Sequence, residues 1–130
     1  MDNKLLSIKI GKVKRVLTGL RKTLIRKISY NRCGEDLLKI SQVLQELCTI
    51  ITKLNTMKKN VDTIKLHHEF MIKYDMTGCN SKIVNLIKKW NDDYVERNKY
   101  LDTIQSNKIE EFNSIINIDV AGSGSTTDAM

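Results

Sequence analysis

Histidine and acidic side chains, the groups most often used in metal binding and in acid–base catalysis, are spaced so that they do not converge. His67 and His68 are adjacent, so on a helix their side chains point about 100° apart and cannot hold one metal ion from a single face. The nearest acids, Asp62 and Glu69, do not complete a His-Glu-x-x-His pattern. We therefore expect one inward-facing and one outward-facing histidine, and no metal site.

The cysteines and the paired acids do not favour catalysis either. Cys33, Cys48 and Cys79 are an odd number without a Cys-x-x-Cys pair, so we expect reduced thiols, buried or at the surface, in a reducing compartment. The adjacent acids Asp92–Asp93 and Glu110–Glu111 suit solvated helix surfaces better than a general acid–base pair. The sequence therefore predicts no catalytic residue and no cofactor, and it favours a binding module over an enzyme.

Charge is distributed unevenly along the chain, whose formal net charge is +7. Residues 1–34 contain ten Lys or Arg and one acid, whereas residues 91–130 contain three Lys or Arg and eight acids. The basic N-terminal segment favours an anionic partner, either nucleic acid or an acidic peptide. A solvated helical face explains the same charges. Tyr30 is the only aromatic of the basic segment, so nucleic-acid binding through residues 1–34 is the second hypothesis.

The composition favours one small helical domain. The chain has 130 residues, of which 41% are hydrophobic and none is proline, so it can bury a single core. No run approaches the roughly 18 apolar residues of a membrane span, and the first residues lack the apolar stretch of a signal peptide. We expect no membrane partner.

Apolar residues recur every three or four positions in several segments, which is the spacing of an amphipathic helix. The first stripe covers residues 6–24 and the second covers residues 37–54. Asn55–Thr56 offers a cap, which predicts that a third helix begins there. Residues 70–76 alternate in polarity before loop signals at residues 77–81, so Phe70 is expected in or beside a loop.

A further stripe begins after Ser81 and includes Trp90. Its register either continues through Ile115 or restarts after Ser106–Asn107. The sequence therefore predicts an all-α fold, a compact bundle of four to five helices. From Ala121 onward the chain is rich in Gly, Ser and Thr, which predicts a flexible C-terminal tail.

Two short segments carry a family resemblance. Residues 81–90, with Leu86 and Trp90, resemble the Leu-x-x-x-Trp signature of the transcription elongation factor S-II N-terminal domain superfamily. Upstream, residues 59–67 look like that family's K-x-V-N-x-L-R-K-H helix. We expect Leu86 and Trp90 to be buried together against the stripe of residues 37–54.

One branch of this superfamily is similar over a longer stretch: the integrase-binding domains of lens epithelium-derived growth factor and its relatives. Residues 31–33, Asn-Arg-Cys, match the start of that branch's second helix, and residues 61–70 are similar to its I-T-T-L-K-K-I-R-R-F helix. The similarity covers roughly residues 5–94, with insertions of about four residues before Val61 and three after Phe70.

The resemblance implies a right-handed bundle of four to five helices that serves as a scaffold for protein binding in transcription elongation and chromatin complexes of the nucleus. Its partners would be disordered acidic, Phe-containing motifs. In that branch the partner inserts between two loops, which map onto Phe70 and Ile72 in one loop and onto Ile25 and Arg26 in the other. Arg26 replaces the family's aspartate and can only donate hydrogen bonds. Lys65 would steer acidic residues of the partner.

Three parts of the chain follow from this interpretation: a helical docking domain in residues 1–100, an extra helix or docking segment in residues 101–120, and a disordered tail or linker in residues 121–130. Ile109–Ile116 resembles the docking motif itself, with acids followed by a Phe and an apolar residue. This segment either occupies the domain's own pocket or continues a packed helix through Phe112.

Overall fold

The computed structural model describes residues 2–30, 37–76 and 81–124. They are helical, with no β-strand among them, which confirms the predicted all-α class. The helices are α1 (Asn3–Ser29), α2 (Leu37–Lys73), α3 (Ser81–Thr103), the π-helical turn η2 (Ile104–Lys108) and α4 (Ile109–Gly124).

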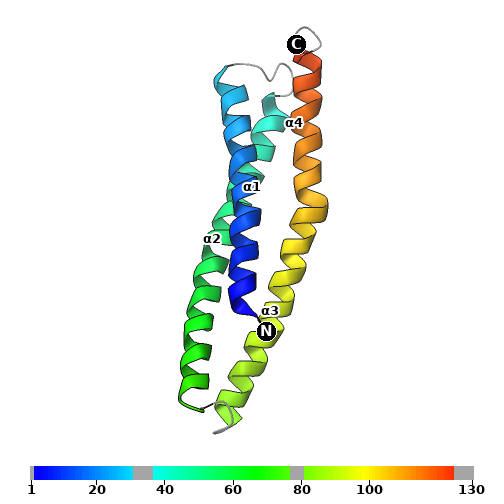
Figure 1. The fold of residues 1–130 in the computed structure, drawn as a ribbon. Helices are drawn as coiled ribbons and strands as arrows, with labels where there is room; N and C mark the ends of the chain where they lie inside the picture. The colour runs from blue at the N-terminus through cyan, green and yellow to red at the C-terminus, as the bar shows by residue number, and fades with distance from the viewer. Residues whose placement is uncertain (1, 31–36, 77–80, 125–130) are drawn as a thin grey trace.

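Three long rods make up the fold, because η2 joins α3 to α4 without a break (Figure 1). α2 runs antiparallel to α1, whereas the rod of α3, η2 and α4 runs in the same direction as α1. The predicted count of four to five helices is therefore not confirmed in the described part of the chain. Of the predicted tail, residues 121–124 belong to α4, and residues 125–130 lie outside the described residues.

α2 passes without interruption through Asn55–Thr56, so the predicted start of a new helix at this point is wrong. The buried stripe keeps its helical spacing across the site, with Leu54 before it and Met57 and Val61 after it. Asn55 and Thr56 both face solvent, where water satisfies their side chains and no cap is required. The continuous apolar face therefore decides the structure over the local capping signal.

α2 ends in a Schellman motif rather than before Phe70. The N–H of Met76 donates to the carbonyl of Met71 at 2.8 Å, and the N–H of Asp75 donates to that of Ile72 at 3.1 Å. Asp75 has a positive φ of 53°, the left-handed conformation that such a C-terminus requires and that Asp tolerates better than most residues. Phe70 and Ile72 consequently lie in the last turns of α2, and the predicted loop there is wrong.

The π-helical turn lets one long rod keep its apolar side inward. Leu101 and Ile104 are fully buried; an unbroken α-helix would next turn Lys108 inward. The extra residue of the π turn rotates the following helix by about 100°, which turns Ile116 toward the core. Phe112 is buried as well. Lys108 then reaches the carboxylate of Glu46 on α2 at 2.8 Å.

The core lies between all three rods. Its members come from both sides of residue 100 in the sequence. Phe112 is fully buried within it, so the packed helix is the alternative that the structure shows for Ile109–Ile116, and not an acidic motif free to occupy a pocket. The buried apolar members are Leu6, Ile10, Val13, Leu17 and Leu24 of α1; Ile40, Val43, Leu47, Ile50, Ile51, Leu54, Met57 and Val61 of α2; and Leu101, Ile104, Phe112 and Ile116 of the third rod.

Candidate docking surface

The two halves of the predicted peptide pocket lie at opposite ends of the bundle. Ser7 of α1 is level with Asp62 of α2, because its hydroxyl donates to that carboxylate at 2.7 Å. Ile25 lies 18 residues up α1 from Ser7, and Phe70 lies 8 residues down α2 from Asp62. At 1.5 Å per residue the two sites are about 40 Å apart along the bundle. Ile25 and its neighbour Arg26 are helical residues of α1 and form no common pocket with Phe70.

Phe70 and Ile72 do not share a face either. Two positions apart on a helix, they point about 200° from each other around α2. The ring of Phe70 packs on that of Tyr74, with centroids 4.6 Å apart. Ile72 instead lies in line with Val61 and Leu54, three and five turns away, on the side of α2 that forms the core. Only Ile72 extends the core stripe.

Trp90 is buried, as predicted, but against a different part of α2. Its side chain is 7% exposed and its ring meets that of His68 edge-on at 6.1 Å. The expected contact with residues 37–54 is wrong because α2 and α3 form an antiparallel hairpin, which pairs the start of α3 with the end of α2. His68 is half-buried and His67 is exposed, which confirms the predicted inward and outward pair.

Leu86 is 38% exposed, so the prediction that it is buried together with Trp90 is wrong. It lies one turn before Trp90 on the same side of α3, where Ile83 and Ile87 are also only partly buried. The reason is visible in Figure 1: α1 begins above this level, and only α2 and α3 continue to the lower end. The core stripes of α2 and α3 thus continue beyond the start of α1. We call Ile72, Ile83, Leu86 and Ile87 the open face.

Two lysines flank the open face. Lys82 and Lys89 lie four residues before and three residues after Leu86, so both are its neighbours on the helix surface. Both are exposed, and neither forms an ion pair within the described ranges. Lys65, the cation expected to steer a partner, is 3.5 Å from Glu69 instead. The open face is therefore an apolar stripe bordered by the cations of Lys82 and Lys89.

Polar contacts fix the level at which α1 begins. The Nζ of Lys58 donates to the hydroxyl of Ser7 at 2.9 Å and to the carboxylate of Asp62 at 3.1 Å. The hydrogen bond from Ser7, followed by the hydrogen bond and charge of Lys58, lowers the pKa of Asp62 against the opposing effect of burial. On the other side, the Nζ of Lys9 donates to Asp102 of α3 at 2.6 Å. Apart from the bond between Lys58 and Asp62, these contacts join residues 51 to 93 positions apart, and no motif in the sequence marks them.

A small hollow of about 240 Å³ lies where α1 starts, between its first residues and His68 of α2. Its lining mixes both charges, with Lys65 and Glu69 of α2 opposite Asp2 of α1. Asp2 is already engaged as the N-cap of α1, where its carboxylate accepts from the N–H of Leu5 at 3.0 Å. The hollow is therefore an edge of the polar junction and not a separate charged site.

The remaining candidate groups do not assemble into a site. In residues 2–30, 37–76 and 81–124, no group of three or more His, Cys, Asp or Glu is arranged to hold a metal ion. Cys48 is exposed on α2, whereas Cys33 and Cys79 lie outside the described residues. No helix of the described chain combines the length and apolarity needed to cross a bilayer.

No family model matches this chain, and no curated protein or solved structure matches it. The similarity of residues 81–90 and 59–67 to the elongation factor S-II N-terminal domain therefore stays a prediction.

Proposed function

We propose that this protein is a docking module that binds a short acidic-hydrophobic segment of a partner protein on the open face. The observation that carries the proposal is the continuation of two core stripes, one on α2 and one on α3, beyond the start of α1. Ile72 is 58% exposed there, while Val61 on the same stripe is fully buried. The open face therefore has the pattern of a core that lacks its third helix.

Burial of this face supplies the free energy of binding. Fully covering an exposed Ile or Leu side chain yields about 1.5–3 kcal/mol in water. Ile72 and Leu86 are 58% and 38% exposed, so covering both yields about 1.5–3 kcal/mol in total, out of the roughly 8 kcal/mol of a micromolar affinity. A segment that folds as an amphipathic helix would lie in the position that α1 leaves empty, with its apolar side toward these residues. Trp90, already packed on His68, forms a rigid border to the site.

The flanking charges favour an acidic partner. Lys82 and Lys89 have no acid within ion-pair distance among the described residues, so carboxylates beside the anchoring apolar residue would meet them directly. The setting in nuclear transcription and chromatin complexes rests on the family resemblance of residues 59–67 and 81–90. The open face itself supports the docking function.

An array of short peptides, in which Asp or Glu flank a Phe or Leu, tests the proposal. The tightest peptide is then titrated against Ile72→Ser and the matched control Phe70→Ser. The two native side chains are exposed to almost the same extent, 58% and 56%, on the same helix but on opposite sides. We expect Ile72→Ser and Leu86→Ser to weaken binding about tenfold or more, and Phe70→Ser to leave it within about twofold.

Two outcomes would contradict the docking surface. Equal losses in Ile72→Ser and Phe70→Ser, with unchanged melting temperatures, would show that the surface lies elsewhere on the hairpin. Failure of every acidic peptide to bind the wild-type protein would contradict the proposal that the partner segment is acidic. Because Ile72 and Phe70 are more than half exposed and Leu86 is 38% exposed, we expect the variants to fold as the wild type does.

A further inference from the structure

α1 carries a dense positive charge on one face. Between Asn3 and Ser29 the helix has nine Lys or Arg and no Asp or Glu. Five of these cations are exposed, and their spacing places them on the side of α1 that faces away from the core. We call them the basic row. The row consists of Lys4, Lys12, Arg15, Lys22 and Arg26.

Other cations of α1 serve the fold, which separates them from the basic row. Lys9 bonds to Asp102 and Asn98 of α3, and Lys27 is buried, its Nζ donating to the carbonyl of Ile116 on α4 at 2.9 Å. Members of the basic row form no ion pair within the described part of the chain. Five like charges on one rod repel one another and weaken folding, so an external anion that neutralises them would be bound favourably.

The geometry of the row suits a chain of phosphates. From Lys4 to Arg26 the helix rises about 33 Å, a length comparable to one turn of duplex nucleic acid. α1 is flanked by the other two rods, so it presents a row of long cationic side chains and cannot enter a groove as a free helix (Figure 1). Such side chains reach the phosphate backbone more readily than base edges.

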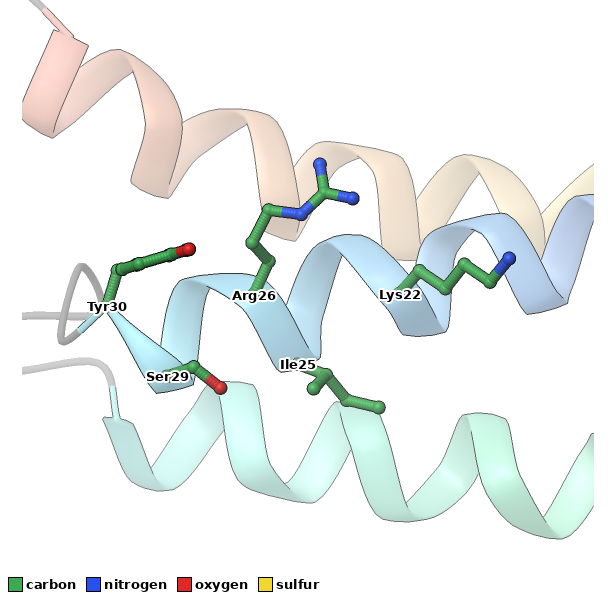
Figure 2. A pocket seen from close by; sticks show the side chains of 5 residues that line it. All are labelled: Lys22, Ile25, Arg26, Ser29 and Tyr30. Carbon is green, nitrogen blue, oxygen red and sulfur yellow. The ribbon is translucent and has the colours of Figure 1, made fainter.

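The upper end of the row adds an aromatic ring. A surface hollow of about 300 Å³ is lined by Lys22, Ile25, Arg26, Ser29 and Tyr30. Figure 2 shows the side chains of Arg26 and Tyr30 projecting to the same side of α1, while Ile25 points to the other. Tyr30 is two-thirds exposed. Two cations beside an exposed ring are the pair of features by which single-stranded nucleic acid is bound, through phosphates and a stacked base.

We propose that the outer face of α1 binds nucleic acid along its phosphate backbone, without reading the base sequence. The basic row holds the phosphates, and Tyr30 stacks on a base where the strand is unpaired. This site is separate from the open face, since it lies on another helix and extends toward the opposite end of the bundle. A partner protein and a nucleic acid would therefore be bound at the same time.

The test measures binding of a 20-base-pair duplex and of a 20-nucleotide single strand by the full chain between 50 and 200 mM salt. If about four phosphates are neutralised, log K falls against log salt with a slope of about −4 for the duplex. The double variant Lys12→Gln with Lys22→Gln should reduce that slope by about 2 and weaken binding at least tenfold at the lowest salt. Tyr30→Ala should weaken the single strand more than the duplex.

The matched control is Lys88→Gln with Lys99→Gln, which removes the same charge from two exposed lysines of α3. We expect its slope to remain close to that of the wild type. If both double variants lose equal affinity, net charge alone explains binding and the site on α1 is overturned. Binding of vesicles with 30% anionic lipid, with no binding of either oligonucleotide, would overturn the proposal in favour of a membrane surface. Absence of any binding at 50 mM salt would also overturn it.

Discussion

Val61 and Ile72 lie on the same stripe of α2, three helical turns apart, and their environments differ completely. Val61 is packed between three rods, whereas Ile72 extends below the start of α1 and is largely exposed. α3 shows the same contrast, with Leu101 fully buried and Leu86 partly exposed. Upper and lower parts of the hairpin have the same apolar pattern, so the contrast shows that coverage by α1, and not the stripe itself, determines burial.

The largest effect is expected in the three-rod part. Phe112→Ala removes a fully buried ring from the core between α1, α2 and α4, and should lower the free energy of unfolding by about 3–5 kcal/mol. Urea denaturation followed by circular dichroism measures the loss. A loss below about 1 kcal/mol would show that residues 109–116 do not pack on the core, and would break the contrast between the two parts.

Trp90 lies at the boundary between the two parts, so its removal tests how far the packed region extends. The ring contacts His68 but does not belong to the main core. We expect Trp90→Ala to cost about 3 kcal/mol, the lower end for a buried aromatic. His68→Ala should cost less, because His68 is only half-buried. A cost near zero for Trp90→Ala would show that the packed region of α3 begins only after residue 90.

The contacts that set the start of α1 should respond to pH. The pKa of Asp62 is below its ordinary value of 3.8, so its ionised form contributes stability above about pH 4, and this contribution is lost as the pH falls through the lowered pKa. Ser7→Ala removes the main cause of the lowered pKa and should cost about 1 kcal/mol at pH 7. The difference from the wild type should shrink below pH 4. A difference that is constant from pH 7 to pH 3 would contradict the role of Asp62.

The smallest effect is expected on the open face. Ile72→Ala should change the free energy of unfolding by less than about 0.5 kcal/mol, because the side chain gives up little contact. Val61→Ala on the same stripe is the matched control and should cost about 2 kcal/mol or more. Similar costs at the two positions, measured by thermal denaturation, would mean that the lower end is covered in solution.

Local sequence patterns predicted the helical class and several faces correctly. The stripe of residues 6–24 became the buried side of α1, and Trp90 was placed inward by its spacing. The same local reasoning failed at Asn55–Thr56, where capping residues lie on an exposed side of a continuous helix. It also failed at residues 70–73, since the Schellman motif that ends α2 depends on the left-handed conformation of Asp75, which lies beyond these residues.

The candidate sites depended on tertiary structure to different degrees. The basic row is visible in the charge count of residues 1–34, because all its members lie on one helix and helical spacing alone places them together. The open face was missed, since Leu86 has the spacing of a core residue. The pairing of Ile25 with Phe70 was wrong. Whether two residues of antiparallel helices lie close together depends on how the helices are aligned along their axes, which the local sequence does not give.

By itself, the sequence determined the helical class and which side of each helix is apolar, because helix formation and the 3.6-residue period depend on near neighbours in the chain. Tertiary structure alone decided how far α1 reaches along the other rods. That level is set by Ser7 on Asp62 and by Lys9 on Asp102, contacts between residues distant in sequence. Burial depends on what covers a face, so only the placement of α1 separates Val61 in the core from Ile72 on the surface.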